Sequence, residues 1–521
     1  MAEAFTAAWY TAVFCVVVVT VVLLKLKGAS ASRRDDGGLR KKNLPPGPWT
    51  LPVIGSMYCL LGGLPHHALH RLARRYGPVM LLRLGHVSTL VVSSPEAARE
   101  VMKTQDAALA NRPVYVTMNI FTYAGQNIAL SPYTSTHWKE LRRLCATELL
   151  SPRRVLAFRP IREEEAASLV AAIISSSSSP TAAPVNVSEK IRLMMNDIIT
   201  RAILGNRSPQ REAYLHEMGN ALKLLAGFNL IDLFPASRLA KVIGGRSLRE
   251  ARQVHARLDR IVKSIIHTHA QAMSADREKE DLLHILLRLQ KDGGLKTTLT
   301  MDVISSTLFE LFSAGSETTM TTITWAMSEL MRNPHAMERA QAEIRQLLQG
   351  KTKVREEDIE GRLHYLQMVI KETLRLHPPV PMLLPRLVAA EGEPCKIMGF
   401  DVPPGTTVLV NAWAIGRDEN SWDNATEFRP ERFEDDVVDF NGADFRFLPG
   451  GAGRRMCPGL MFGLSNIELT LTTLLYHFDW KLPNRASSTE LDMSESQGIT
   501  ARRKTDLWLQ ATPYVPTNAN M

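Results

Sequence analysis

The loop that contains Cys457 is the sequence feature that most restricts what this chain can fold into. In the stretch 447–459, FLPGGAGRRMCPG, three glycines before the cysteine permit a tight turn, and a long apolar segment follows. We expect Pro458 to be the first residue of a helix, so that the thiol lies at its N-terminus beside Arg454 and Arg455. The helix dipole and the two cations would favour the thiolate, which is the form that binds metals or acts as a nucleophile.

Two interpretations of Cys457 are open on this loop alone. A single cysteine cannot hold zinc, but it can be the sole protein ligand of a haem iron. The alternative is a buried structural cysteine in a glycine-rich turn. The other four cysteines are scattered and form no C-x-x-C pair, which indicates neither a disulfide framework nor a metal cluster.

The N-terminus contains an apolar run, residues 4–24, without any charge. Its 21 residues are long enough to cross a hydrocarbon core of roughly 30 Å, so we predict a membrane anchor at residues 1–27. Basic residues follow the run and none precedes it, which places the rest of the chain on the cytoplasmic side. A cleaved signal peptide is the alternative, but its basic n-region is missing and the apolar run is too long.

A hinge and a large folded body follow the predicted anchor. Residues 28–50 are basic and then rich in proline, and the run PPGP at 45–48 holds the backbone extended. Residues 51–521 are predicted to form the folded body, because 45% apolar residues and a mean hydropathy of −0.09 are typical of a globular protein and exclude several membrane spans. The net charge of +9 suits an anionic membrane surface, and no nucleic-acid motif is present.

Hydrophobic periodicity predicts that the body is mainly α with small β-sheets. Short runs at 79–84 and 89–92 predict strands around a Gly85 turn, and similar runs are sparse later in the chain. The long helices are expected at residues 138–150, 187–204, 245–273, 302–332, 334–349, 363–376 and 460–478.

Polar residues interrupt the apolar helix expected at 302–332. The run AGSET, residues 314–318, lies in its middle, where glycine and polar side chains cost helix stability. A hydroxyl beside a small-residue gap can bend the helix, hold a water and make room for a diatomic ligand, and Glu317 can supply protons to that ligand. An ordinary kinked core helix is the alternative.

Two further sets of polar residues lie on or near predicted helices. Glu372 and Arg375 are spaced i,i+3, and Arg432 in the downstream run FRPERF offers a third member of a buried network. Trp138 and Arg142 are spaced i,i+4, and their N–H groups can clamp carboxylates such as haem propionates. Taken alone, the first set is also explained by a surface ion pair and the second by a half-buried tryptophan.

In this order and at these distances, the motifs resemble those of a cytochrome P-450, a haem-thiolate monooxygenase, and specifically a plant microsomal enzyme of the A-type. The resemblance covers the whole chain, from the predicted anchor and hinge to the tail at 492–504. It implies a cytochrome P-450 fold preceded by one transmembrane helix, with residues 51–521 as the haem-thiolate catalytic domain. It also implies haem b as cofactor, O2 as oxidant, and electrons from NADPH through a partner reductase.

The resemblance implies a role for each of the residues singled out. The axial ligand of the haem iron would be Cys457, and the proton-delivery pair would be Glu317 and Thr318. The residues that would contact the haem propionates are Trp138, Arg142, Arg386 and Arg455. The structural triad would be Glu372, Arg375 and Arg432. The residues that would line the substrate pocket include Phe121, Ala314, Met382, Leu383 and Ile499.

One position departs from the family pattern. The family usually has a phenylalanine seven residues before the cysteine, and this chain has Gly450. The spacing of the loop is otherwise intact, so we still expect haem binding. The reduction potential and the affinity for haem depend on burial and on hydrogen bonds to the sulfur, and both are expected to be affected.

The expected activity is the insertion of one oxygen atom from O2 into a small hydrophobic plant metabolite. Because the segments expected around the pocket are apolar, a terpenoid, such as a sesquiterpene or diterpene, is the first expectation, and a phenylpropanoid, flavonoid or indole-derived substrate is the alternative. A non-oxygenating haem isomerase or dehydratase, and a non-enzymatic haem or ligand carrier, are further alternatives. The expected location is the endoplasmic reticulum membrane, with the catalytic domain in the cytosol.

Overall fold

The computed structural model describes residues 43–177, 183–205, 210–225, 230–272, 280–293, 295–389, 395–485, 487–496 and 498–514. The anchor predicted at 1–27 and most of the hinge predicted at 28–50 lie outside these residues. Within the ranges given, no helix combines the length and the apolar character needed to cross a membrane.

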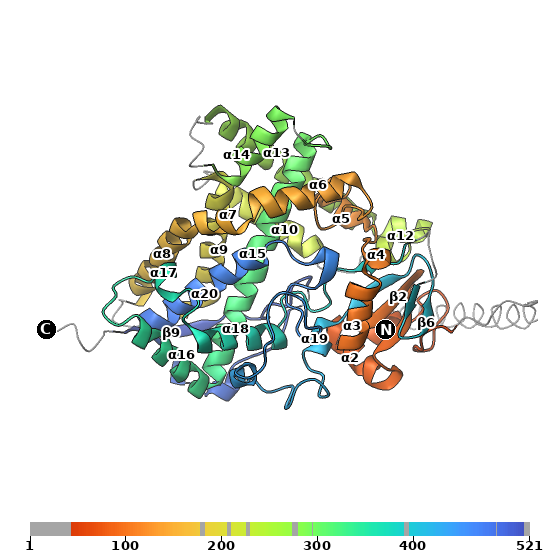
Figure 1. The fold of residues 1–521 in the computed structure, drawn as a ribbon. Coiled ribbons are helices and arrows are strands. Elements are labelled where there is room, and N and C mark those ends of the chain that lie inside the picture. The colour runs from red at the N-terminus through yellow and green to blue at the C-terminus, as the bar shows by residue number, and fades with distance from the viewer. Residues whose placement is uncertain are drawn as a thin grey trace, which may run out of the picture.

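The described part of the chain is mainly helical, as predicted (Figure 1). The long helices expected from periodicity are all present, and the first of them continues as a π-helical turn, Cys145–Leu149. The helices are α2 (Pro65–Tyr76), α3 (Pro95–Arg99), α4 (Asp106–Leu109), α5 (Val116–Phe121), α6 (Thr136–Leu144), α7 (Pro152–Ala157), α8 (Arg159–Ser177), α9 (Val187–Leu204), α10 (Arg211–Leu225), α11 (Leu230–Leu233), α12 (Arg238–Ile243), α13 (Gly245–Ala272), α14 (Leu282–Asp292), α15 (Met301–Arg332), α16 (Pro334–Leu347), α17 (Glu356–Ile359), α18 (His364–Leu376), α19 (Ala412–Ile415) and α20 (Leu460–His477).

Helix α15 runs through the core and packs against α9 and α20. Its second half is buried on nearly all sides, and apolar residues such as Ile323, Trp325 and Leu330 are fully buried there. The helix is unbroken from Met301 to Arg332. Gly315 permits close packing, because a Cβ at this position would lie 2.9 Å from Cδ1 of Ile199 on α9.

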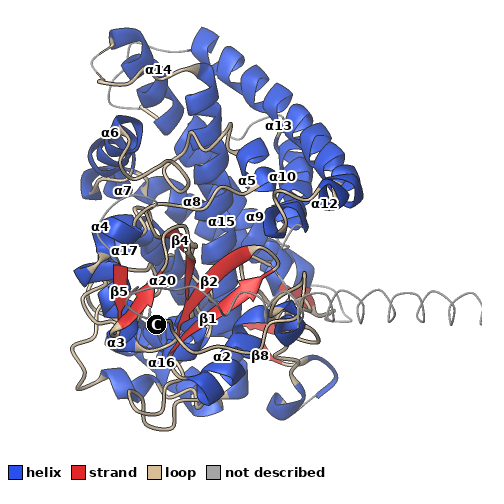
Figure 2. Ribbon diagram, turned by 90° about the vertical axis from the view of Figure 1, so that its right-hand side faces the viewer, coloured by secondary structure: helices blue, strands red, loops and turns tan. Residues whose placement is uncertain are grey.

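The strands form three small sheets, which all lie in the lower half of Figure 2. In Figure 1, β2 and β6 lie at one end of the molecule and β9 at the other. The largest has the order β1-β2-β7-β4, in which β2 pairs parallel with β7 and the other neighbours are antiparallel. The two strands predicted from alternation are its β1 and β2, in register through Val79 and Val92. The strands are β1 (Val79–Leu84), β2 (Val87–Val92), β3 (Val185–Asn186), β4 (Arg386–Leu387), β5 (Cys395–Ile397), β6 (Phe400–Val402), β7 (Thr407–Val410), β8 (Phe478–Lys481) and β9 (Trp508–Pro513).

The end of the predicted hinge is docked on the folded body. The backbone N–H of Asn43 donates to the carboxylate of Asp401 at 2.8 Å, and the N–H of Leu81 in β1 donates to the carbonyl of Pro46 at 2.8 Å. The chain is therefore attached to the folded body from residue 43 onward, within the segment predicted to be the hinge.

Candidate active site

The cysteine loop before α20 is held by close backbone contacts. The N–H of Cys457 donates to the carbonyl of Gly450 at 2.9 Å. Gly453 has a φ of +70°, and a Cβ there would lie 2.1 Å from the carbonyl oxygen of Met102, so only glycine fits. The predicted tight loop is therefore present, and the side chain of Cys457 lines an internal cavity.

The position of Cys457 relative to the following helix differs from the sequence prediction. Helix α20 begins at Leu460, so Pro458 lies two residues before the helix and not at its first position. Arg454 donates a hydrogen bond to the Tyr133 hydroxyl, and Arg455 donates to three backbone carbonyls. Burial raises the pKa of the Cys457 thiol, and a backbone N–H and a nearby arginine offset this effect only in part. A metal cation bound at the sulfur would act in the opposite direction and stabilise the thiolate.

The cavity beside Cys457 has a volume of about 580 Å³ and mostly apolar walls. Helix α15, the first turns of α20, and the loops at 127–130, 379–384 and 498–502 form these walls. This volume lies in the range of about 300–1,000 Å³ that is usual for small-molecule and cofactor sites. A smaller cavity of about 150 Å³ adjoins it and shares Leu383 and Ile499 in its walls.

The residues predicted to line the substrate pocket fall into three groups. Ala314, Leu383 and Ile499 line the main cavity, and Leu383 adopts a left-handed φ of +47°. Met382 lines the smaller cavity only. The sequence prediction is not met for Phe121, which lines neither cavity, because its ring is buried one layer behind the wall and stacks on Phe309 with 5.9 Å between ring centroids.

All four residues predicted to contact haem propionates line the main cavity. In the structure, the donors of Trp138, Arg386 and Arg455 are used within the protein. Nε1 of Trp138 donates to the carbonyl of Ile128 at 3.0 Å, and Arg386 pairs with Asp106 at 2.6 Å. Arg455 donates to the same Ile128 carbonyl at 3.0 Å and stacks over the Trp138 ring at 4.6 Å.

Arg112 lines the same cavity and was missed at the sequence level. Its guanidinium donates to the backbone carbonyls of Ala129, Leu384 and Pro385. Burial, together with the charges of Arg455 and Arg386, lowers the pKa of Arg112 well below its usual value. The only sequence feature that could have indicated a role for Arg112 at the cavity is its position just before segment 113–129, which was expected to line the pocket.

Glu310 on α15 was also missed, because it lies one turn before the AGSET run. Its carboxylate accepts hydrogen bonds from the N–H groups of Ile128 and Ala129, both at 2.9 Å. Burial raises the pKa of Glu310 to about 7, although these N–H groups and the nearby Arg455 act against the rise. Glu310 therefore fixes the segment whose Ile128 carbonyl holds Trp138 and Arg455.

Glu317 and Thr318, the predicted proton-delivery pair, both line the main cavity. The hydroxyl of Thr318 donates to the carbonyl of Ala314 at 2.8 Å. The carboxylate of Glu317 accepts from the Thr500 hydroxyl at 3.0 Å and lies 3.5 Å from the Arg502 guanidinium. The loop that carries Thr500 and Arg502 therefore holds Glu317 at the cavity wall.

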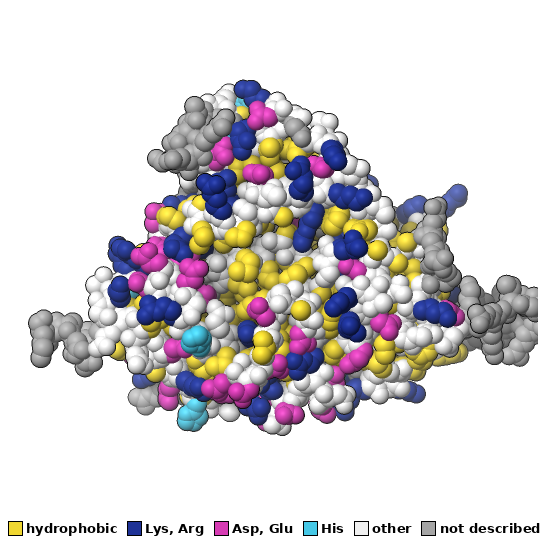
Figure 3. Space-filling model, in the orientation of Figure 1, with side chains coloured by type: hydrophobic (Ala, Val, Ile, Leu, Met, Phe, Trp, Pro, Cys, Tyr) yellow, Lys and Arg dark blue, Asp and Glu magenta, His cyan; other side chains and the backbone are white. Residues whose placement is uncertain are grey.

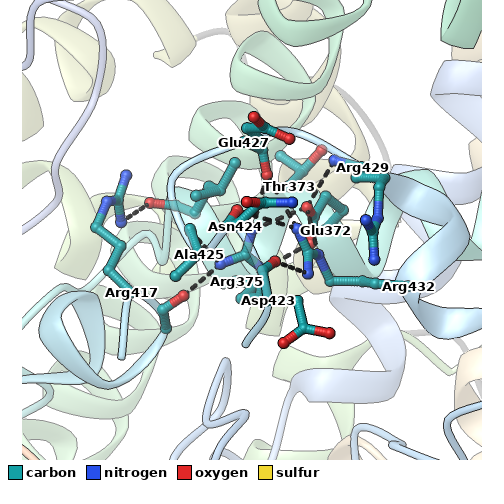
Figure 4. A network of polar contacts seen from close by, with 12 residues as sticks. Glu372, Thr373, Arg375, Arg417, Asp423, Asn424, Ala425, Glu427, Arg429 and Arg432 are labelled. Carbon is teal, nitrogen blue, oxygen red and sulfur yellow. Dashed lines mark hydrogen bonds and ion pairs between the residues drawn. The ribbon is translucent and has the colours of Figure 1, made fainter. Parts of the chain in front are cut away.

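The predicted triad forms a fully buried network away from the cavity (Figure 4). The carboxylate of Glu372 accepts from Nε of Arg375 at 2.6 Å and from Nε of Arg432 at 2.9 Å. The remaining donors of Arg375 reach backbone carbonyls, including those of Gly416 and Ala425, in a loop with no regular secondary structure. The network holds the end of α18 against this loop, as the sequence interpretation expected.

Comparison with known proteins identifies the family of this fold. A family model described as cytochrome P-450 matches residues 45–508. The chain belongs to the cytochrome P-450 family. The chain is 44% identical over 483 residues to premnaspirodiene oxygenase of Hyoscyamus muticus, covering 92% of this chain and 94% of the relative. It is 46% identical over 479 residues to desmethyl-deoxy-podophyllotoxin synthase of Sinopodophyllum hexandrum, covering 91% and 92%.

A solved zebra fish cytochrome P-450 with progesterone has the same fold as this chain. The TM-score is 0.74 at 28% identity, and the match covers 86% of this chain and 99% of the fish protein. Together these findings confirm the resemblance to plant-type cytochromes P-450. The protein is therefore a monooxygenase that carries a thiolate-ligated haem, uses O2 with electrons from a reductase, and acts on small hydrophobic substrates.

The residues around the main cavity fit such a haem. Arg112, Arg386 and Arg455 lie close enough for their charges to affect one another, and the carboxylates nearest to them are Asp106 and the buried Glu310. This local excess of positive charge suits a group with two carboxylates. Cys457 offers the sulfur ligand in the same cavity.

Proposed function

We propose that Cys457 is the axial ligand of the haem iron and that Glu317 and Thr318 deliver protons to the oxygen-binding side. The observation that carries this assignment is that the Cys457 loop and the polar pair on α15 line one cavity from two different elements. The contact between Gly450 and Cys457 fixes the loop on one side. The unbroken helix α15 fixes the pair on the other.

The haem propionates are proposed to bind among Trp138, Arg142, Arg386 and Arg455. Their place in the cavity wall and the local excess of positive charge support this assignment. On haem binding, Trp138 and Arg455 would exchange the Ile128 carbonyl for a carboxylate, which makes a stronger hydrogen bond. Arg112 would keep its hydrogen bonds to three backbone carbonyls, and its positive charge would attract the haem propionates without contacting them.

The haem, when bound, supplies the activation of O2 and the transfer of one oxygen atom to a C–H bond. The chain positions the substrate and controls water and protons. The apolar residues of the wall at 379–384, together with Ile499, reduce the access of bulk water to a bound substrate. The Thr318 hydroxyl, held on the Ala314 carbonyl, keeps its oxygen free to accept a hydrogen bond from a water in the cavity. Glu317, oriented by Thr500, can pass a proton to that water.

The space next to the proposed ligand is closed by an aliphatic side chain. A Cβ at Gly450 would lie 3.1 Å from Cδ2 of Leu460 and 3.4 Å from the Cβ of Cys457. The Leu460 side chain therefore lies in close contact with the position that the Cβ of the family's phenylalanine would take. We propose that this leucine takes over the shielding of the sulfur that burial by an aromatic ring supplies elsewhere.

A terpenoid is the proposed substrate class. The mostly apolar cavity supports a neutral hydrophobic substrate, and one of the reported relatives is named for the oxidation of a terpenoid, premnaspirodiene. The other relative is named for a podophyllotoxin derivative, so a phenylpropanoid-derived or other aromatic substrate is the alternative. The presence of both Glu317 and Thr318 in the cavity favours oxygenation over a non-oxygenating isomerase or dehydratase.

Titration of the haem-loaded protein with candidate substrates tests this proposal. The reduced carbonyl spectrum is checked first, and then terpene olefins, flavonoids and indoles are added while the spin state of the haem is followed. A low-to-high-spin shift confined to terpenes supports the proposed class, and product analysis with reductase present then identifies the oxidised carbon. A shift only with flavonoids or indoles contradicts the terpenoid proposal.

We propose that the protein is anchored in the endoplasmic reticulum membrane and that α12 rests on the bilayer. Leu239, Val242 and Ile243 on this short helix are 67%, 77% and 61% exposed. Trp49, which follows the predicted hinge run PPGP, is 74% exposed. Helix α12 lies on the same side of the molecule as β2 and β6 (Figure 1). Exposed apolar side chains grouped in this way are typical of a membrane-contacting surface.

The proposed reductase binds on the face that carries α6 and α7. On this face, Lys and Arg side chains surround a largely apolar centre, with Asp and Glu among them (Figure 3). The side chains of Arg143 on α6 and Arg454 in the cysteine loop are 57% and 55% exposed. Exposed cations near the cysteine loop would guide an acidic partner into position.

A further inference from the structure

A cluster of two histidines and a glutamate lies outside the active site, between α2 and the C-terminal part of the chain. Nε2 of His66 lies 2.6 Å from Oε2 of Glu495, and Nε2 of His67 lies 3.4 Å from the same oxygen. The three ligand atoms all lie within 4.8 Å of one another. None of these residues takes part in the proposed haem chemistry.

We propose that His66, His67 and Glu495 form a binding site for one Zn²⁺ ion. Two imidazole nitrogens and one carboxylate oxygen are ligands that zinc prefers, and three protein ligands leave the fourth position for water. Zinc bonds of about 2.0–2.2 Å in a tetrahedron separate neighbouring ligand atoms by about 3.3 Å. The distance from His67 to Glu495 already matches this value, and the distance from His66 to Glu495 would need to increase by about 0.7 Å.

The state of one ring nitrogen also supports the assignment. Nε2 of His67 is buried and, although it lies 3.4 Å from Oε2 of Glu495, it makes no hydrogen bond among the described residues. A buried ring nitrogen without a partner is rare in proteins and is costly unless a ligand or water satisfies it. The His67 side chain is nevertheless 34% exposed, which gives an ion a route to the cluster.

The surroundings hold the ligands in place. Nε1 of Trp413 donates to Oε1 of Glu495 at 3.3 Å, and the Trp413 ring packs against the His67 ring at 4.3 Å. The backbone carbonyl of His66 accepts from Asn411 at 2.9 Å. Arg417, the charged neighbour, stacks on Trp413 at 3.9 Å and donates to a backbone carbonyl, so it is held away from the ligand atoms but lowers the affinity for a cation.

The site would fasten a wall of the active-site cavity. Glu495 pairs with Arg503 in an isolated β-bridge, and Ser496 donates to the carbonyl of Arg502 at 2.8 Å. The tip of this loop carries Ile499 and Thr500, which line the main cavity. A zinc ion would therefore link the base of the loop to the start of α2 and restrict its motion.

Zinc binding by the haem-loaded protein tests the proposal directly. The protein is freed of metal ions with a chelator, dialysed against ZnCl₂ and assayed for bound zinc by elemental analysis, with the reduced carbonyl spectrum as a check of folding. We expect one bound Zn²⁺ per chain in the wild type and its loss in His67→Ala and in Glu495→Gln. His70→Ala is the matched control, because His70 lies on the same helix and contacts Trp413 at 5.5 Å but is not a member of the cluster.

A second measurement is the midpoint of thermal unfolding with and without zinc. Zinc is expected to raise the midpoint of the wild type and of His70→Ala and to leave that of His67→Ala unchanged. A wild type that binds no zinc above the level of His67→Ala overturns the proposal and makes the cluster a hydrogen-bonded contact only. Equal zinc binding in His67→Ala and the wild type also overturns it.

Discussion

Replacement of Glu372 by glutamine is the sharpest test of how this fold is held together. The Glu372 side chain is 0% exposed and accepts from Arg375, Arg432 and the backbone N–H of Arg429 at 2.6–2.9 Å. Glutamine keeps the shape but removes the charge and turns one acceptor into a donor. Two guanidinium groups would then lose their only carboxylate in a buried site (Figure 4).

The expected cost follows from this geometry. Removal of one partner from a buried, hydrogen-bonded ion pair costs about 3–5 kcal/mol. The stability of a domain is about 5–15 kcal/mol, so Glu372→Gln is expected to lower the ratio of folded to unfolded protein by about a thousandfold. The measurement is urea unfolding, followed by tryptophan fluorescence and by loss of the haem absorption band.

A second glutamate supplies the matched control. Glu189 on α9 also pairs with an arginine at i,i+3, Arg192, but these side chains are 42% and 40% exposed. Glu189→Gln is expected to cost less than about 1 kcal/mol, because exposed pairs contribute little. Equal unfolding midpoints for Glu372→Gln and Glu189→Gln would refute the reasoning, since burial would then have no influence on the strength of the pair.

Three further predictions concern the active site. Cys457→Ser is expected to abolish the thiolate signature of the reduced carbonyl spectrum, and an unchanged spectrum would remove Cys457 from the iron. Thr318→Ala is expected to bind substrate normally but to consume NADPH with little product; full coupling of NADPH to product would contradict the proton-delivery role. Because burial raises the pKa of Glu310 to about 7, stability is expected to fall by about 3 kcal/mol as the pH rises from about 4.5 to about 7. Glu310→Gln should lack this part of the pH dependence in urea unfolding, and identical pH profiles would show that Glu310 does not titrate in this range.

The sequence by itself determined the features that depend on neighbours along the chain. Periodicity located seven of the longer helices but not α8 or α10, because it detects helices whose apolar residues recur every three to four positions on one face. The glycines before Cys457 predicted a tight loop, and Gly453 shows why, since its positive φ and its contact with Met102 exclude any side chain. The motifs around Glu317, Glu372 and Cys457 were sufficient to indicate the family.

Only the tertiary structure decided which polar groups lie at the cavity and in which direction their pKa values are shifted. Glu310 meets Ile128 across 182 residues, and Arg112 meets Leu384 across 272, so no local pattern reveals either contact. The pKa of the Cys457 thiol also depends on burial by distant segments, which outweighs the local effects that the sequence suggested. The same holds for His67, whose position beside Glu495 arises only when the C-terminal segment folds back onto α2. Local sequence selects elements and turns, whereas burial and charge pairing are set by which elements come together.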